Sequence, residues 1–219
     1  MEEFLSPGLF RRGSAFYTRN LVPGERVYGE EVIRVDDVEY RRIDPWRSKL
    51  GAFLHKGGRT WPWGRVRRLL YLGASSGTTV SHLSDILAGS RIYALEKSPR
   101  PFALLLELSS RRPNVIPLLA DAQRPELYSS QVGPVEGIYQ DLAQRDQARI
   151  LRENAQACLK PHSWVFLQLK CRSVTQTASP RQVLRQSVEQ LRTFGFQVQE
   201  EVDLSPYSRD HYTVVARWG

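Results

Sequence analysis

The chain has 219 residues, of which 41% are hydrophobic and 25% charged, a balance typical of a globular protein of one large domain or one domain with a small appendage. Its 31 lysines and arginines exceed its 23 acids, and the net charge of +8 favours a polyanionic partner. No apolar run approaches the roughly 20 residues of a membrane span, and the first residues lack the order of a signal peptide. Two cysteines and four scattered histidines indicate neither a disulfide scaffold nor a metal site. We therefore expect a cytoplasmic protein without a metal.

Residues 1–50 alternate apolar and polar positions over short stretches. "VPGERV" contains a Pro-Gly turn, and "EEVIRVDDVEYRRI" alternates around Asp36-Asp37. Such stretches predict a small antiparallel β domain. Because so short a segment buries little apolar surface alone, we expect it to pack against the rest of the chain.

From residue 66 onward, predicted strands and helices alternate. The repeated βα units favour a mostly parallel sheet covered on both faces by helices, residues 51–219 forming this second domain. The predicted strands are 66–72, 90–96, 114–120, 135–142, 163–170, 196–204 and 211–219, and the predicted helices are 78–88, 99–112, 145–159 and 179–195. No helix separates the last two strands, which predicts an antiparallel hairpin at one edge. The helix over 78–88 is amphipathic, with its apolar face formed by Val80, Leu83, Ile86 and Leu87.

The stretch "YLGASSGTT", residues 71–79, follows the first of these strands. In an open α/β sheet, this position at the carboxyl end of a strand is where ligands bind. The spacing Gly73-x-x-x-Gly77 matches neither the phosphate loop ending in Gly-Lys-Ser/Thr nor the dinucleotide pattern Gly-x-Gly-x-x-Gly. Glycines allow a backbone to approach a ligand closely, and the following helix offers free N–H groups.

Three successive strands end in a carboxylate: Glu96, Asp121 and Asp141. One such acid alone is more often a helix cap or a turn residue. Three together, beside a loop without lysine or arginine, do not suit a cofactor rich in phosphate. They suit a ligand with ribose hydroxyls and a cationic group, such as S-adenosylmethionine.

Asp141, Lys170 and His211 form a second group at predicted strand ends. If the last strand is antiparallel, its start lies at the same edge as the ends of the parallel strands. A lysine that closes an apolar strand requires a carboxylate partner, which Asp141 can supply. The group is either a structural ion pair or the site where a hydroxyl acceptor is oriented and loses its proton.

Several longer motifs together resemble fibrillarin over nearly the whole chain: "YLGASSGTTVSHLSDI", "DPWRSKLGAFL", "IYQDLAQRDQARI", "LKCRS" and "PYSRDHYTVV". The segment "NLVPGERVYGEEVIRVDDVEYR" is similar to the N-terminal domain of the archaeal form. The chain lacks the Gly/Arg-rich extension of eukaryotic members. Where the family commonly has an aromatic residue after Glu96 this chain has Lys97, and Cys171 stands in place of a small alanine.

The resemblance implies a Rossmann-like S-adenosylmethionine-dependent methyltransferase fold, an α/β fold whose mostly parallel seven-stranded sheet ends in an antiparallel hairpin, beside the small N-terminal β domain. It implies guide-RNA-directed 2′-O-methylation of ribose in rRNA, with tRNA as a further substrate, by the catalytic subunit of a box C/D ribonucleoprotein. The implied partners are box C/D guide RNA, target RNA, a Nop-family scaffold protein and a kink-turn-binding protein of ribosomal type, without a membrane.

The catalytic residues that the resemblance implies are Lys49, Asp141, Lys170 and His211. The cofactor-binding positions expected from the loop, the strand ends and the resemblance together are Gly73, Ala74, Ser75, Gly77, Thr78, Thr79, Glu96, Lys97, Asp121, Ala122, Asp141 and Gln144. Two other hypotheses stay open: a nicotinamide-dependent oxidoreductase, which the loop spacing disfavours, and a non-catalytic assembly subunit on the same fold. The aromatic and basic stretch 59–68 has no assigned function.

Overall fold

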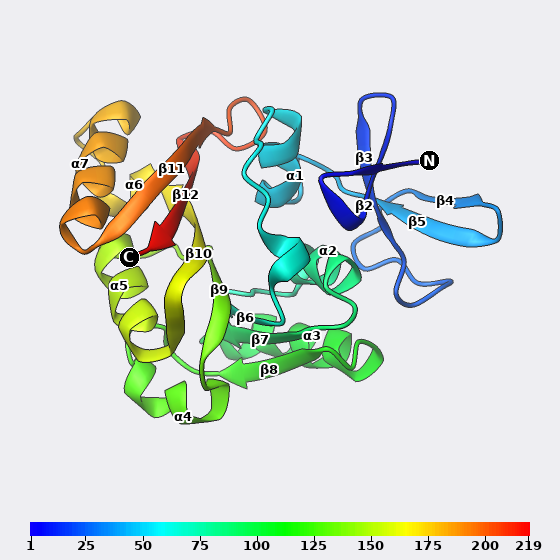
Figure 1. Ribbon diagram of the computed structural model, residues 1–219, viewed down its shortest axis with the longest axis horizontal. Coiled ribbons are helices and arrows are strands. Elements are labelled where there is room, and N and C mark those ends of the chain that lie inside the picture. Colours follow the sequence, from blue (N-terminus) through cyan, green and yellow to red (C-terminus); the bar gives the residue numbers. More distant parts are fainter.

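Two β-sheets organise the chain, and the computed structural model describes residues 1–219 in full (Figure 1). The smaller sheet is antiparallel, with the strand order β1-β2-β3-β5-β4. Its strands are β1 (Glu2–Phe4), β2 (Ser6–Arg12), β3 (Ala15–Arg19), β4 (Val32–Val35) and β5 (Val38–Arg42). This sheet confirms the predicted N-terminal β unit. The proposed division at residue 50 stays a prediction, and the helix α1 (Lys49–His55) already begins one residue before residue 50.

The larger sheet has seven strands in the order β11-β12-β10-β9-β6-β7-β8. Its strands are β6 (Arg68–Leu72), β7 (Arg91–Glu96), β8 (Val115–Leu119), β9 (Val135–Gln140), β10 (Leu159–Lys170), β11 (Phe196–Asp203) and β12 (His211–Trp218). The first five run parallel, whereas β12 is antiparallel to both β10 and β11. The mostly parallel sheet with a C-terminal antiparallel hairpin is therefore confirmed.

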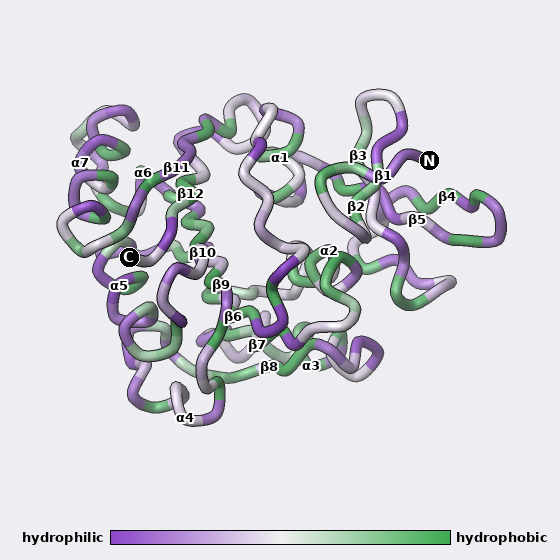
Figure 2. The backbone as a smooth tube through the Cα atoms, in the orientation of Figure 1, coloured by the Kyte–Doolittle hydropathy of each residue, from purple (hydrophilic) through white to green (hydrophobic).

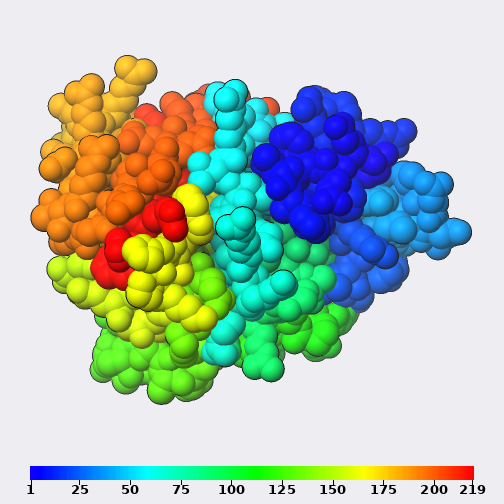
Figure 3. Space-filling model, in the orientation of Figure 1, coloured from blue at the N-terminus to red at the C-terminus, as the bar shows by residue number.

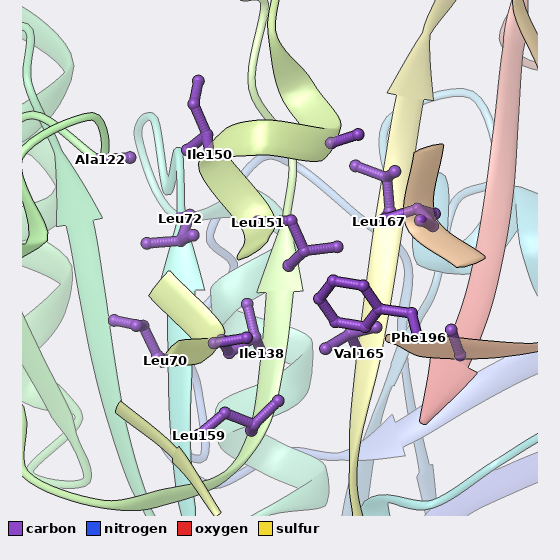
Figure 4. Close-up of a cluster of buried hydrophobic side chains, with 14 of the residues drawn as sticks. Leu70, Leu72, Ala122, Ile138, Ile150, Leu151, Leu159, Val165, Leu167 and Phe196 are labelled. Carbon is purple, nitrogen blue, oxygen red and sulfur yellow. The ribbon is translucent and has the colours of Figure 1, made fainter. Parts of the chain in front are cut away.

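Helices cover both faces of the larger sheet. They are α1, α2 (Thr78–Ile86), α3 (Pro99–Arg111), α4 (Ser129–Val132), α5 (Gln147–Cys158), α6 (Cys171–Val174) and α7 (Pro180–Thr193), with 3-10 turns η1 (Trp63–Arg65) and η2 (Pro125–Leu127). Alternate residues of one strand enter different cores: Leu70 packs in the cluster with α5 and α7, and Leu69 in the cluster with α1, α2 and α3. Figure 4 shows the first cluster, where Leu151 of α5 lies against the strand residues Ile138 and Leu167. Burying each such leucine contributes about 2 kcal/mol.

The turn residues explain how the N-terminal strands connect. Asp36 and Asp37 both have positive φ, 49° and 61°, and Val35 pairs with Val38, which is the two-residue hairpin that right-twisted strands favour. Pro23-Gly24 also forms a turn, closed by Glu25 N–H donating to the Val22 carbonyl at 3.2 Å. Both predicted turns are confirmed.

Helix α2 differs from its sequence expectation. The apolar face is buried as predicted, but its polar face, including Ser81, His82 and Asp85, is buried as well. The smaller sheet covers this face and supplies partners: the Arg41 guanidinium lies 2.7 Å from Asp85 Oδ2 and 2.6 Å from the Glu30 carboxylate. The helix is amphipathic in composition but enclosed on both sides, because a second sheet packs onto its polar face.

Candidate active site

The glycine loop and the acids that end β7, β8 and β9 line one cavity of about 310 Å³, within the lower range of small-molecule sites. The cavity lies at the carboxyl ends of the parallel strands, the edge predicted from the sequence. Eight of the predicted cofactor-binding residues line it: Gly73, Ser75, Glu96, Lys97, Asp121, Ala122, Asp141 and Gln144. Further lining residues that sequence reasoning missed are Leu95, Ser98, Pro101, Ala120, Leu142 and Ala143.

The two glycines of the loop are required by the packing of the protein itself. Gly73 has φ +83°, and a Cβ there would lie 2.2 Å from the carbonyl oxygen of Asp141. Gly77 has φ +91°, and its Cβ would lie 2.5 Å from a methyl group of Leu108. Residues other than glycine rarely adopt such backbone conformations. The sequence predicted that the glycines let the backbone come close to a ligand. In the structure they let it come close to Asp141 and Leu108 of neighbouring chain segments.

Glu96 holds the loop in place. Its carboxylate oxygens accept hydrogen bonds from the backbone N–H of Ser75 at 2.9 Å and from that of Ser98 at 2.7 Å. Ser75 has φ +51°, an uncommon value for a non-glycine residue, and this hydrogen bond stabilises it. Each carboxylate oxygen can accept a further hydrogen bond, and Glu96 lines the cavity, which suits hydrogen bonds from the hydroxyls of a ribose.

Four predicted cofactor-binding residues do not line the cavity: Ala74, Gly77, Thr78 and Thr79. The Thr79 hydroxyl lies 3.1 Å from that of Ser48, so it connects α2 to the start of α1. Thr78 lines a separate groove together with Arg26 and Arg47. A role for these residues in cofactor binding stays a prediction.

Lys97 occupies the mouth of the cavity. Its ammonium lies 3.8 Å from Asp121 Oδ2, and its side chain is 52% exposed. An exposed ion pair of this kind contributes at most about 1 kcal/mol. At this position the chain therefore presents an exposed charge instead of a flat ring.

Lys49 and Asp141 are joined in the structure although they lie 92 positions apart. Lys49 is the first residue of α1, after the N-cap Ser48. Its Nζ lies 2.7 and 2.8 Å from the two carboxylate oxygens of Asp141. The partner expected for Asp141 was Lys170, and this expectation was wrong: α1 places Lys49 on the Asp141 carboxylate, and Lys170 forms no ion pair.

Lys170 is held through its backbone by Gln147 of α5. The buried Gln147 amide accepts from the Lys170 N–H at 3.0 Å and donates to the Lys170 carbonyl at 3.0 Å. Lys170 also pairs with His211 in the β10–β12 register. The last residue of β10 and the first of β12 are thereby fixed side by side.

His211 is arranged as a proton acceptor. Burial lowers its pKa below the usual 6.5, and the nearby Lys49 and Lys170 cations lower it further, against the backbone carbonyl of Arg209 and Asp141, which raise it. Its Nδ1 lies 2.7 Å from the Arg209 carbonyl, which can only accept, so Nδ1 carries the hydrogen. Nε2 of the neutral ring is then left as an acceptor.

The structure gathers no cluster of three or more His, Cys, Asp and Glu side chains suited to a metal ion. No helix combines the length and the apolar composition needed to cross a bilayer.

Comparison with known proteins decides the family. The fibrillarin family model matches residues 8–219. The chain belongs to the fibrillarin family.

Relatives within this family cover the chain from end to end. The fibrillarin-like rRNA/tRNA 2′-O-methyltransferase of Methanosarcina barkeri is 44% identical over 219 residues, 97% of this chain and 96% of that protein. Aeropyrum pernix fibrillarin, solved with natively bound S-adenosyl-L-methionine, is 38% identical with a TM-score of 0.86, over 99% of this chain and 100% of that one. The fibrillarin of a fibrillarin/Nop5p complex is 40% identical with a TM-score of 0.90, over 100% of both chains.

Proposed function

We propose that this fibrillarin-family chain transfers a methyl group from S-adenosylmethionine to the ribose 2′-oxygen of rRNA and tRNA. The observation that carries the proposal is the juxtaposition of two features at one sheet edge. A cavity lined by three strand-end acids adjoins the group formed by Lys49, Asp141, Lys170 and His211. The M. barkeri and A. pernix relatives support the reaction and the cofactor.

The residues that line the cavity fit S-adenosylmethionine by their chemistry. Glu96 offers lone pairs to ribose hydroxyls, and Asp121 and Asp141, each paired with one lysine, add carboxylates to the lining that suit a ligand with a sulfonium and an ammonium. When bound, this cofactor supplies an electrophilic methyl group. Ala74, Gly77, Thr78 and Thr79 would contribute by supporting the loop.

The chain's own residues manage the proton of the acceptor. A 2′-hydroxyl must lose its proton as its oxygen gains the methyl group, and the neutral His211 Nε2 is free to accept it. The Lys170 ammonium, without a carboxylate partner, can stabilise the charge that develops on the oxygen. Lys49 fixes the orientation of Asp141, which belongs to both the cavity and the reaction centre.

The finer proposal concerns the assembly. We infer that guide RNA selects the nucleotide, that the chain is the catalytic subunit of a box C/D ribonucleoprotein, and that a kink-turn-binding protein holds the RNA. The fibrillarin/Nop5p complex supports a scaffold protein as a direct partner.

Methyl transfer in a reconstituted complex tests the proposal. With guide RNA, scaffold and kink-turn-binding protein present, Lys170→Ala and Asp141→Ala are expected to lose at least 100-fold in rate, whereas Lys56→Ala, an exposed lysine at the end of α1, keeps the wild-type rate. Wild-type rates in both site variants would overturn the assignment of these residues. Equal activity on free RNA without the other components would overturn the guided assembly alone.

A further inference from the structure

The edge of the larger sheet opposite the active site is basic. Five exposed cations lie at this edge: Arg65 and Arg67 before β6, Arg91 at the start of β7, Lys160 at the start of β10 and Arg217 near the end of β12. We call these five residues the basic edge. Glu136, the second residue of β9, is the only acid in the loops before β6, β7, β8, β9 and β10 and in the first two residues of these strands. The carboxyl ends of the same strands carry the three acids of the cavity, so charge of opposite sign gathers at the two edges.

Strand register places Arg217 and Arg91 in adjacent rows at the same end of the sheet, because Arg91 is paired with Arg68 of β6 and precedes Ile92. Trp164 of β10 is paired with Arg217 of β12 and with Gly137 of β9. Leu69 of β6 is paired with Gly137 and with Ile92 of β7. Adjacent strands lie about 4.8 Å apart, so this row spans roughly 19 Å. Figure 3 shows the cyan segment before β6, the yellow start of β10 and the red C-terminus side by side on one face.

The basic edge keeps a net positive charge because Glu136 offsets only Lys160 of its five cations. The Glu136 carboxylate accepts hydrogen bonds from the backbone N–H of Arg67 at 3.3 Å and of Arg68 at 2.7 Å, and it pairs with Lys160. The guanidinium groups of Arg65, Arg67 and Arg91 form no ion pair. Figure 2 shows the segment before β6 as strongly hydrophilic.

Arg217 is held in place by His162 and Trp164. Its Nε and one terminal nitrogen donate to the His162 carbonyl at 3.3 and 3.1 Å, and its guanidinium lies 5.3 Å from the centre of the Trp164 ring. Guanidinium groups that are oriented without a carboxylate partner suit phosphate oxygens, which they bind in pairs.

The surroundings favour a nucleic acid over a protein partner. The exposed large hydrophobic residues of the chain are Met1, Leu5, Trp46, Leu104, Leu106, Leu119 and Leu127. None belongs to the segments of the basic edge, whereas the core of a protein interface is apolar and depleted of charge. Several exposed cations at one edge of the sheet suit the repeating negative charge of a phosphate backbone.

We propose that the basic edge binds the phosphate backbone of RNA at a second surface, separate from the reaction centre. This inference rests on the proposed function only in that it names RNA as the polyanion. Such a contact would hold a stretch of the guide or target RNA while another stretch occupies the active site.

The triple variant Arg65→Gln, Arg67→Gln, Arg91→Gln tests the inference. Its matched control carries Arg181→Gln, Arg185→Gln and Arg192→Gln on α7, which removes the same charge from an exposed helix. Binding of an RNA duplex of about 20 base pairs is measured by fluorescence anisotropy between about 50 and 200 mM salt. The expected result is at least a tenfold loss of affinity and a salt dependence, log K against log salt, shallower by about 2 to 3. The control should change far less.

The following outcomes test the inference and separate it from the proposed function. Equal loss in the triple variant and the control would overturn the inference, because total charge would then explain binding. Loss of scaffold binding with RNA affinity intact would overturn it in favour of a protein partner. Calorimetric binding of S-adenosylmethionine should be unchanged in both variants. Wild-type protein that binds RNA through the basic edge yet transfers no methyl group in the full complex would overturn the proposed function and leave this inference standing.

Discussion

The side-chain amide of Gln147 bonds both backbone polar groups of Lys170, each at 3.0 Å. The backbone carbonyl of Gln147 in turn accepts from the side chain of Gln140, at the end of β9, at 2.7 Å. The start of α5 therefore fixes the ends of two neighbouring strands relative to each other. Both the backbone N–H and the backbone carbonyl of Lys170 are thus held by hydrogen bonds.

Removing this clamp should slow methyl transfer without removing a reacting group. We expect Gln147→Ala to lower the rate in the assembled complex by about 10- to 100-fold, because a displacement of about 1 Å has effects of that size. Gln156→Ala, an exposed change on the same helix, is the control. Single-turnover kinetics at saturating cofactor measures the effect, and a wild-type rate in Gln147→Ala would show that Lys170 needs no such support.

The pH dependence of methyl transfer should report on His211. Burial lowers its pKa below 6.5, so the ring is neutral at pH 7. If Nε2 accepts the proton, the rate is constant above pH 6.5 and falls about tenfold per pH unit below the lowered pKa. Single-turnover rates between about pH 5 and pH 8 measure the profile. The variant His211→Gln should be slow and lack this limb, whereas an unchanged profile in that variant would assign the titration elsewhere.

Asp85 should be among the most sensitive residues for stability. It accepts hydrogen bonds from Arg41 at 2.7 Å, Arg112 at 2.6 Å, Thr18 at 2.7 Å and the Leu21 N–H at 3.0 Å, and both arginines are fully buried. Asp85→Ala leaves two buried cations poorly compensated, which costs about 3–5 kcal/mol of unfolding free energy. Urea unfolding measures the loss. The exposed control Glu126→Ala should change stability by less than about 0.5 kcal/mol, and equal effects would contradict a buried network.

The same cluster predicts a dependence of stability on pH. Burial, with the Arg41 and Arg112 charges, lowers the pKa of His82 well below 6.5. The unfolded chain then binds more protons than the folded chain below pH 6.5. The contribution of His82 to the free energy of unfolding is therefore fully present above pH 6.5. It is lost as the pH falls, by up to about 1.4 kcal/mol per pH unit.

The pKa of His211 is lowered as well, so the variant His82→Gln is needed to separate the contributions of His82 and His211 to the pH dependence of stability. We expect the urea midpoint of His82→Gln to fall less steeply than that of the wild type between about pH 7.5 and pH 5.5. His162→Gln, at an exposed position, should follow the wild-type slope. Parallel curves for His82→Gln and the wild type would mean that His82 does not report on folding.

Most of the fold could be predicted from local patterns in the sequence. Turn chemistry at Asp36-Asp37 and strand–helix alternation from residue 66 placed the elements correctly, because these depend on neighbours in the chain. Helix α1 was missed: it is short, and its residues 50–54 are all buried, so no polar face marks a helical period. The Ser48 cap before it was the available indication.

Contacts between distant segments were beyond the reach of pattern reasoning. Strand-end acids identified the cavity, yet only the folded chain shows that Lys49 and not Lys170 contacts Asp141. Arg41 reads as a surface charge on a short strand, but it is fully buried against Glu30 and Asp85. Its environment depends on how two sheets pack, which neither segment encodes alone.

The contact between Ser48 and Thr79 has a thermodynamic consequence. One hydroxyl caps the helix that carries Lys49, and the other lies in the first turn after the glycine loop. A ligand whose binding shifts one of these segments therefore acts on the other through this contact, and linkage makes the effect reciprocal. Filling of the cavity beside the glycine loop and the seating of Lys49 on Asp141 are thus expected to change each other's free energy by the same amount.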